Sequence, residues 1–206
     1  MKIICIGRNY IDHAKELNNP VPSKPVVFMK PSSALLVNNK PFYYPEFTKD
    51  LHHEIEVVLK VCKNGRHVQP EFASGYYDQV GLGIDFTARD LQSDCKAKGH
   101  PWEIAKGFDG SAVLGPFLPI EQVNRSAVEF HLEKNGEKVQ EGNTKDLIFS
   151  FEEVIVYVSK FFKLQVGDLI YTGTPAGVGP VKVGDRLTGF LHTKSTIKEM
   201  FVCDIK

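Results

Sequence analysis

Residues 51–61 read LHHEIEVVLKV, and the second half of this stretch, IEVVLKV, is the strongest strand signal in the chain. β-Branched and aliphatic residues of this kind favour strands. In a strand, side chains two residues apart point to the same face. Glu54 and Glu56 therefore share one face of the predicted strand, and Ile55 and Val57 share the other. The segment predicts a strand that carries an acidic pair on one side.

The acidic pair allows two interpretations. Two adjacent carboxylates repel each other unless a cation or a proton lies between them, which favours a cation site. Alternatively, the strand lies at an exposed edge, and both acids face water. A third acid, Asp85, ends the predicted strand VGLGID at residues 80–85. Strand ends and the loops beyond them commonly carry ligands, although Asp85 could instead cap the helix that follows.

Glu54, Glu56 and Asp85 together would supply three hard oxygen ligands. That chemistry suits Mg²⁺ or Mn²⁺, and Ca²⁺ less well. Three protein ligands on an octahedral ion would leave positions for two substrate oxygens and a water. Spacing alone does not show that the three side chains meet.

Turn signals divide the rest of the chain into further strands. Asn64-Gly65 and Asn135-Gly136 each stand between apolar runs, and both predict hairpins because the two turn residues tolerate positive φ. Gly-Asp precedes an apolar strand at residues 167–168 and again at 184–185. Two similar turns explain this pair better than an internal repeat.

Three helices are predicted. The first covers residues 10–18, and the second covers residues 87–98, with Thr87 and Asp90 as a variant capping box and Gly99 as the stop.

The third predicted helix, at residues 150–163, opens with a capping box of Ser150 and Glu153. Its apolar residues recur at helical spacing and predict a buried stripe of Phe151, Val154, Ile155, Val158, Phe161 and Phe162. No linker or change of composition divides the chain. We therefore expect one α+β, β-rich domain over residues 1–206.

The composition excludes several classes of protein. The 206 residues are 42% hydrophobic and 24% charged, with a formal net charge of zero and no basic face that would favour nucleic acid. No apolar run approaches the roughly 20 residues that a membrane-spanning helix needs. The N-terminal MKIICIGRNY is too short for a signal-peptide core, and the four cysteines form no C-x-x-C pair. These features predict a cytoplasmic protein with reduced thiols.

Further candidates for chemistry lie on the predicted helices. His13 and Glu16 are neighbours at i and i+3, as in a carboxylate-oriented general base, although an ordinary surface pair has the same spacing. Arg89 and Gln92 have that spacing one turn beyond Asp85 and could bind a substrate carboxylate or carbonyl, or simply face solvent. Lys106 lies in an apolar stretch, where it could stabilise an enolate or extend its amine to water.

The Gly-rich segment TGTPAGVG at residues 172–179 follows a predicted strand. It lacks the Lys and Ser/Thr of a phosphate-binding P-loop. Its backbone N–H groups and the Thr174 hydroxyl could hold a carboxylate, or the segment could be a tight turn.

These segments resemble, in order and over almost the whole chain, the fumarylacetoacetate hydrolase family. The motifs that carry the resemblance are GRNY (7–10), HAKEL (13–17), VFMKP (27–31), LHHEIE (51–56), DFTARDLQ (85–92), PW (101–102), AK (105–106), NG (135–136), Gln140 and TGTPAGVG (172–179). The resemblance is closest to the compact branch of acylpyruvases and oxaloacetate decarboxylases.

The resemblance implies a fold and a set of residue roles. The fold would be a mixed β-sandwich roll of the fumarylacetoacetase C-terminal-domain type, usually in a homodimer, with Mg²⁺ or Mn²⁺ as cofactor. By position, the metal ligands would be Glu54, Glu56 and Asp85; the catalytic residues His13, Glu16 and Lys106; and the substrate-binding residues Arg89, Gln92 and Thr174.

On this basis we expect a metal-dependent hydrolase that cleaves the C–C bond of acylpyruvates to pyruvate and a carboxylic acid. In that reaction Glu16 would polarise His13, which would deprotonate the attacking water, and Lys106 would stabilise the pyruvate enolate. Two alternatives remain open. One is an oxaloacetate decarboxylase or tautomerase, and the other is an isomerase or decarboxylase of aromatic meta-cleavage products. The partner would be a small 2-keto acid, with no nucleic acid and no membrane.

Overall fold

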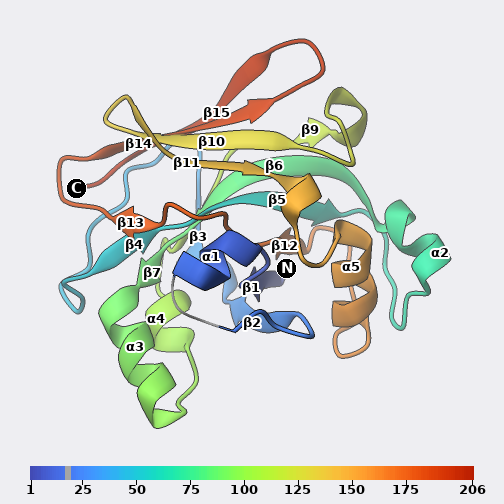
Figure 1. Ribbon diagram of the computed structural model, residues 1–206, viewed down its shortest axis with the longest axis horizontal. Coiled ribbons are helices and arrows are strands. Elements are labelled where there is room, and N and C mark those ends of the chain that lie inside the picture. The colour runs from blue at the N-terminus through green and yellow to red at the C-terminus, as the bar shows by residue number, and fades with distance from the viewer. Residues whose placement is uncertain (17–19) are drawn as a thin grey trace.

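The computed structural model describes residues 1–16 and 20–206, and a large curled sheet forms its centre (Figure 1). Neighbouring strands in this eight-stranded sheet follow the order β2 (Val26–Lys30), β1 (Ile3–Gly7), β12 (Leu169–Tyr171), β5 (Ile55–Val61), β6 (Tyr77–Asp85), β8 (Ala112–Leu114) and β3 (Leu35–Val37), with β9 (Leu118–Pro119) paired to β6. The pairs β1–β12 and β3–β8 are parallel and the other pairs are antiparallel, so the sheet is mixed. The predicted strand at 55–61 is confirmed as an interior strand.

A second sheet packs against β5 and β6 and completes a sandwich. Its order is β11 (Glu137–Asn143), β10 (Glu129–Lys134), β14 (Arg186–His192) and β15 (Ile197–Asp204). Val57 and Leu82 of the large sheet share one buried cluster with Phe130 and Leu191 of the small sheet. The predicted class, an α+β, β-rich roll, is therefore confirmed.

Side-chain alternation places Val58 on the other face of β5, in a second buried cluster with Tyr171. Glu56 lies two residues before Val58 in β5, so its side chain points to the same face. The acidic pair thus lies on the face of the large sheet that points away from the small sheet. A third, three-stranded sheet borders this face, in the order β13 (Gly179–Pro180), β4 (Leu51–His53) and β7 (Thr87–Ala88).

One hairpin prediction is confirmed and the other is wrong. Asn135 and Gly136 turn β10 into β11 with φ of 55° and 85°, as an Asn-Gly turn requires. Asn64-Gly65 makes no two-residue turn. β5 pairs instead with β6, from residue 77 onward, and Gly65 forms an isolated bridge to Leu164. Long-range pairing of β5 has overridden the local turn signal.

The helices are short. They are α1 (Ile11–Glu16), α2 (Pro70–Ala73), α3 (Arg89–Lys98), α4 (Glu103–Lys106) and α5 (Phe151–Ser159), together with 3₁₀ turns at Ser32–Ala34, Ser74–Tyr76, Ile120–Gln122 and Thr144–Asp146. The end of the first predicted helix, Leu17 and Asn18, lies outside the described residues. α3 stops at Gly99, with φ of 66°, as predicted.

The predicted capping box at Thr87 is wrong. Thr87 pairs with His52 in β7, so its backbone is extended, and α3 begins at Arg89 without a side-chain cap in the described structure. Asp90 accepts hydrogen bonds from Thr48 Oγ1 at 2.6 Å and from the Lys49 amide at 3.0 Å. Tertiary pairing to β4 determines the conformation here.

The capping box of α5 is confirmed, since Ser150 and Glu153 exchange both hydrogen bonds. The helix ends earlier than predicted, at Ser159. Phe151, Val154, Ile155 and Val158 are buried as predicted, but the Phe161 side chain is 58% exposed. The predicted stripe is therefore wrong at Phe161, because the chain leaves the helix before that residue.

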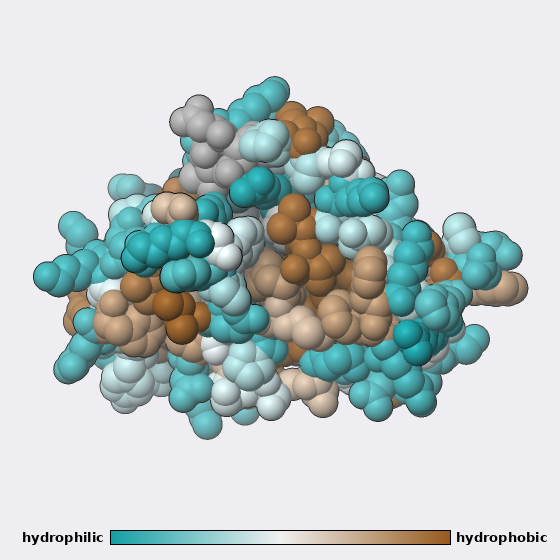
Figure 2. All heavy atoms as spheres, turned by 90° about the horizontal axis from the view of Figure 1, so that it is seen from below, coloured by the Kyte–Doolittle hydropathy of each residue, from teal (hydrophilic) through white to brown (hydrophobic). Residues whose placement is uncertain are grey.

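Figure 2 shows one side of the molecule, where apolar patches interrupt a mostly hydrophilic surface. No helix within residues 1–16 and 20–206 is long and apolar enough to cross a membrane. All four cysteines are free thiols, and Cys62 is the one that is only half-buried.

Candidate metal centre and active site

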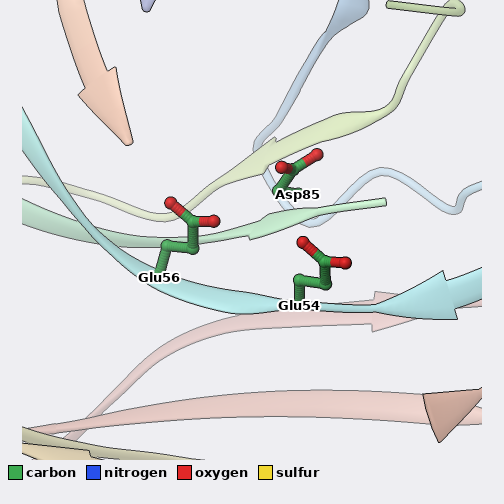
Figure 3. Close-up of side chains that lie close together, drawn as sticks. All are labelled: Glu54, Glu56 and Asp85. Carbon is green, nitrogen blue, oxygen red and sulfur yellow. The ribbon is translucent and has the colours of Figure 1, made fainter. Parts of the chain in front are cut away.

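Glu54, Glu56 and Asp85 meet at the ends of β5 and β6. The strand register places Ile55 opposite Ile84 and Glu56 opposite Gly83, and the Asp85 amide donates to the Glu54 carbonyl at 2.8 Å. Figure 3 shows the three carboxylates converging from these two strands. One oxygen from each lies within 4.8 Å of the others, the only such group of three or more acidic, His or Cys side chains in the described structure.

The alternatives considered for these acids do not hold. Glu54, Glu56 and Asp85 are 5%, 2% and 1% exposed, so the strand is no solvated edge. Asp85 caps no helix, because β7 lies between it and α3. Three carboxylates buried together require compensating positive charge.

Three cationic side chains lie against two of these carboxylates, those of Glu54 and Asp85. Lys106 Nζ, from α4, lies 2.9 Å from Glu54 Oε2 and 2.7 Å from Asp85 Oδ2. Lys30 Nζ, from β2, lies 2.7 Å from Asp85 Oδ1, and Arg89 contacts the other oxygen of Glu54. Lys106 is itself 3% exposed, so the interpretation that its amine extends to water is wrong.

This arrangement divides the two glutamates electrostatically. Burial alone would raise the pKa of Glu54, but Lys106 and Arg89 hold that pKa well below its usual value. The pKa of Glu56 is raised well above its usual value by burial and by the neighbouring charge of Asp85. Burial opposes the charged form of Lys106, yet Asp85 and Glu54 raise its pKa. Glu56 is thus the acid with the least cationic compensation.

The donor set fits a divalent cation. Asp85 Oδ1 is buried and, within the described residues, accepts no hydrogen bond, although Lys30 lies beside it as an ion-pair partner. Glu56 faces the same point, and among residues 1–16 and 20–206 its Oε2 accepts from the Gly173 amide alone, at 2.7 Å. Carboxylate oxygens with free lone pairs suit Mg²⁺ or Mn²⁺.

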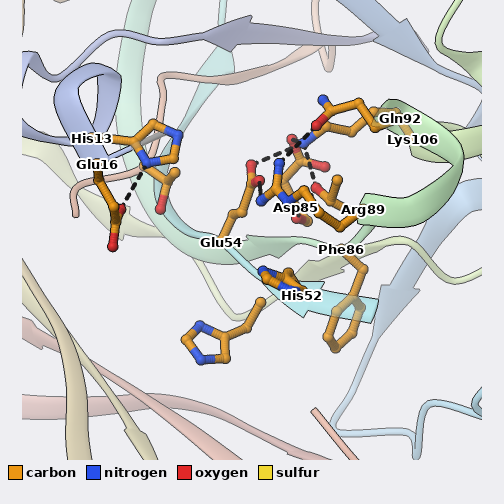
Figure 4. A network of polar contacts seen from close by, with 12 residues as sticks. His13, Glu16, His52, Glu54, Asp85, Phe86, Arg89, Gln92 and Lys106 are labelled. Atoms are coloured by element: carbon orange, nitrogen blue, oxygen red, sulfur yellow. Dashed lines mark hydrogen bonds and ion pairs between the residues drawn. The ribbon is translucent and has the colours of Figure 1, made fainter. Parts of the chain in front are cut away.

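His13 and Glu16 approach this centre from α1 (Figure 4). His13 Nδ1 lies 3.3 Å from Glu16 Oε2, and His13 lines the same cavity as the three carboxylates. His13 is 4% exposed. Burial lowers the pKa of His13, against the opposing effect of Glu54 and Glu16. The structure therefore brings a buried imidazole with a lowered pKa to the acidic centre, while its partner Glu16 lies at the surface.

The Gly-rich segment at residues 172–179 holds protein carboxylates. Gly173 N–H donates to Glu56, and Gly177 N–H donates to Glu16 Oε1 at 3.0 Å. Gly173 has φ of 107°, and a Cβ there would lie 2.6 Å from Asn9 Cβ, so the close approach requires glycine. In the described structure the N–H groups of this segment hold side chains of the protein, so a role of Thr174 in binding a substrate carboxylate stays a prediction.

Gln140, on β11, connects this segment to β5. Its Oε1 accepts from His53 Nδ1 at 2.8 Å and from the Ile55 amide at 3.1 Å. Its Nε2 donates to Thr174 Oγ1 at 2.9 Å. The sequence motif included Gln140, but no local pattern indicated that it would bridge Thr174 to the strand of the acids.

The cavity is small, with room of about 30 Å³ for water. Arg89, Gln92 and Thr174, the predicted substrate-binding residues, line it, and Arg89 Nη1 donates to Gln92 Oε1 at 2.7 Å. Arg8 and Lys96 also line it, and we did not predict them. Burial, reinforced by the nearby charge of Arg8 and then Arg89, lowers the pKa of Lys96 to about 8.

Comparisons with known proteins agree with this site. Residues 2–200 match the model of the fumarylacetoacetate (FAA) hydrolase C-terminal family. The chain is 43% identical over 197 residues to "Oxaloacetate tautomerase FAHD1, mitochondrial" of Bos taurus, covering 95% of this chain and 89% of that protein. It is 42% identical over 185 residues to "Oxaloacetate decarboxylase, mitochondrial" of Dictyostelium discoideum, covering 89% and 85%.

A similar solved structure is that of fumarylpyruvate hydrolase from Pseudomonas aeruginosa in complex with Mn²⁺ and pyruvate. It has a TM-score of 0.91 and 36% identity, and the match covers 100% of this chain and 89% of that one. With a family match over nearly its full length and a matching fold, the chain belongs to the fumarylacetoacetate hydrolase C-terminal family of enzymes.

Proposed function

We propose that the protein is a divalent-metal-dependent oxaloacetate tautomerase that interconverts the enol and keto forms of this 2-keto acid. The observation that carries the proposal is a buried, carboxylate-paired histidine that faces a buried trio of acids in one cavity. A tautomerase needs a proton-transfer group beside a centre that stabilises an enolate. This replaces acylpyruvate hydrolysis, which we expected first, by the alternative that the named relatives support better.

Glu54, Glu56 and Asp85 would hold the cation, which we propose to be Mg²⁺ or Mn²⁺. When bound, such an ion would act as a Lewis acid on a 2-oxo group and favour the enolate charge. The Mn²⁺ in the Pseudomonas aeruginosa neighbour supports a divalent ion of this kind. Lys106 and Arg89 add fixed positive charge at the same place.

His13 would move the proton. Glu16 accepts the Nδ1 proton of His13, which leaves the lone pair on Nε2 available to the substrate. In the enol-to-keto direction the enol oxygen loses a proton and C3 gains one, so one proton-transfer group can serve both steps. Gly177 holds the second oxygen of Glu16 and so orients the pair.

Oxaloacetate carries two carboxylates, and the cavity supplies cations for both. Arg89 lies next to the acidic centre, and Arg8 and Lys96 line the same cavity. Together with Gln92 and Thr174 they would bind and orient the substrate.

Hydrolysis of acylpyruvates is a second candidate, because the neighbour of known structure is a fumarylpyruvate hydrolase and the same His13–Glu16 pair could activate water. Decarboxylation of oxaloacetate is a related activity, since it also passes through an enolate at C2–C3, although loss of CO₂ makes this the enolate of pyruvate. The sequence predictions of one catalytic domain over residues 1–206, a homodimer and a cytoplasmic location remain predictions, although both named relatives are mitochondrial.

The test is a comparison of three reactions with one preparation of the protein and Mn²⁺. The reactions are ketonisation of enol-oxaloacetate, pyruvate release from oxaloacetate and pyruvate release from acetylpyruvate. We expect ketonisation to have the largest kcat/KM and to be lost with excess EDTA. Faster release from acetylpyruvate would transfer the assignment to hydrolysis, and faster release from oxaloacetate to decarboxylation.

A further inference from the structure

Two basic side chains line the outer end of the cavity that contains the acidic centre. Arg8 follows β1 directly, and Lys96 lies in the last turn of α3. Arg8 is half-buried and Lys96 is exposed, whereas Glu54, Asp85 and Lys106 are buried. The cavity therefore has an inner end with the carboxylates and an outer end with these two cations.

The cations at the outer end differ from the inner ones in their partners. Arg89 and Lys106, which line the same cavity, both pair with Glu54. Within residues 1–16 and 20–206, by contrast, neither Arg8 nor Lys96 forms an ion pair or donates a side-chain hydrogen bond. Partial burial and then the charge of Arg8 lower the pKa of Lys96 to about 8, as expected when two like charges are held close together. An anion bound between them would relieve this repulsion.

The backbone at Arg8 is held in a conformation that arginine seldom adopts. Its φ of 58° lies in the left-handed region, which favours glycine, asparagine and aspartate. The next residue, Asn9, is fully buried; its Nδ2 donates to the carbonyls of Phe149 at 3.0 Å and Thr172 at 2.8 Å. These bonds fix the chain where it leaves β1, and the Arg8 side chain then lines the cavity. Strained residues of this kind are typical of ligand clamps.

Aromatic rings connect the two ends of the cavity. Lys96 Nζ lies 5.5 Å from the centre of the Trp102 ring, and the centres of the Trp102 and Phe28 rings are 5.9 Å apart. Lys106 Nζ, at the inner end, lies 5.1 Å from the centre of the Phe28 ring. All four side chains line the same cavity. A ligand that spans it would therefore meet cations at both ends and apolar rings along its middle.

We propose that Arg8 and Lys96 form a subsite for the second carboxylate of a 2-keto dicarboxylic acid, an inference that rests on the tautomerase function proposed above. The 2-keto acid end of such a substrate lies at the inner end, beside Lys106 and Arg89. Its other carboxylate accepts hydrogen bonds from the guanidinium and the amine at the outer end. A monocarboxylic 2-keto acid would leave both cations without a partner, so the subsite selects substrates with two carboxylates.

The subsite also influences which reaction follows. In ketonisation the second carboxylate keeps its negative charge throughout, so cations that hold it stabilise the substrate and the transition state alike. In decarboxylation the C3–C4 bond breaks, its electron pair forms the enolate of pyruvate, and the carboxylate leaves as neutral CO₂. Cations that hold this carboxylate therefore stabilise the bound substrate more than the transition state for loss of CO₂. Arg8 and Lys96 thus favour proton transfer over decarboxylation.

The experiment is calorimetric titration of the Mn²⁺-saturated full chain with malate and with lactate. Both acids carry a carboxylate and a 2-hydroxyl group at one end, and malate alone has a second carboxylate. We expect malate to bind about tenfold or more tightly than lactate, the usual contribution of a hydrogen bond to a charged group. Arg8→Asn and Lys96→Gln should each remove most of this preference and leave lactate binding unchanged. Asparagine tolerates the backbone conformation at position 8, so Arg8→Asn should fold.

The matched control is Lys98→Gln, on the same helix but outside the cavity, where Lys98 pairs with Asp94 at 2.9 Å. It should bind malate as the wild type does. In Arg8→Asn and Lys96→Gln the ratio of pyruvate release to ketonisation of oxaloacetate should rise, and in Lys98→Gln it should not.

Equal affinity of the wild type for malate and lactate, or parallel loss of both acids in Arg8→Asn and Lys96→Gln, would overturn the subsite. An unchanged ratio of pyruvate release to ketonisation would overturn its effect on the reaction. Ketonisation by the wild type tests the proposed function separately. A tautomerase that binds the two acids equally lacks the subsite, whereas a malate preference without ketonisation would retain the subsite and contradict the tautomerase.

Discussion

The proposed active site has two halves, the three carboxylates and the His13–Glu16 pair, and they are built differently. Glu56 and Asp85 sit on β5 and β6, and Glu54 is the single residue between β4 and β5, so sheet pairing fixes their positions. His13 and Glu16 sit on α1, a helix of six residues that ends beside the three residues outside the described structure. A few hydrogen bonds, chiefly those from Gly177 and within the pair, orient this second half. The comparison suggests that metal binding and proton transfer are separable functions.

The largest loss of activity is expected when one of the three carboxylates held by the sheet is replaced. Asp85→Asn removes a carboxylate that faces Lys30 and Lys106 and should abolish Mn²⁺ binding. We expect turnover to fall by about 10³-fold or more, because the electrostatic centre for the enolate is lost. Asp94→Asn, on the exposed side of α3, is the control and should bind Mn²⁺ normally. Normal Mn²⁺ affinity in Asp85→Asn would disprove the ligand assignment.

A substitution in the His13–Glu16 pair should lower catalysis without changing Mn²⁺ affinity. His13→Asn should lower ketonisation by about 10²–10⁴-fold, the usual contribution of a general acid–base group. Its Mn²⁺ affinity should match that of the wild type, since His13 approaches the trio from another element. Loss of Mn²⁺ affinity together with activity would show that the two halves are not separable.

Gln140 connects β5 to the segment at 172–179, which in turn holds Glu16. Its replacement should lower activity by an intermediate amount. Gln140→Ala leaves the Ile55 amide and the Thr174 hydroxyl without their partner, so the segment at 172–179 should lose its alignment with β5. We expect a decrease of about 10–100-fold in kcat/KM, as is typical for residues that orient ligands. Gln140→Glu, which retains the acceptor Oε1, should recover part of it. An unchanged kcat/KM would contradict the positioning role.

The smallest expected change is a shift in the pH dependence of activity, and it is specific to His13. Because burial lowers the pKa of His13 below 6.5, the imidazole stays neutral at pH values where a free histidine is half protonated. Activity with saturating Mn²⁺ should therefore persist at pH 6.5 and decline only at lower pH. Measuring Mn²⁺ affinity at each pH separates this loss from protonation of the carboxylates. An acidic limb centred above 6.5, or one unchanged in His13→Asn, would argue against His13 as the base.

Much of the fold could be predicted because its signals are local. Alternation along 51–61, the Asn135-Gly136 turn and the Ser150–Glu153 box each act over a few residues. The predictions failed where distant pairing decides. Thr87 became a strand residue through pairing with His52, and Asn64-Gly65 gave way to the pairing of β5 with β6.

In the site, too, contacts between segments distant in the sequence could not be predicted. Periodicity placed Glu54 and Glu56 on one face, but only the register of β6 shows that Asp85 joins them. Lys30 reaches Asp85 from β2, and Gln140 reaches Ile55 from the other sheet, so no spacing in the sequence could give them roles. The family motifs contained both residues without indicating what they contact.

The most direct test of the account is exchange of the C3 protons of oxaloacetate with deuterium in D₂O, followed by NMR alongside pyruvate formation. With Mg²⁺ or Mn²⁺ the protein should accelerate exchange above the enzyme-free rate and well ahead of pyruvate release, and EDTA should remove the acceleration. Pyruvate release without faster exchange, or exchange that is indifferent to EDTA, would contradict a metal-dependent tautomerase.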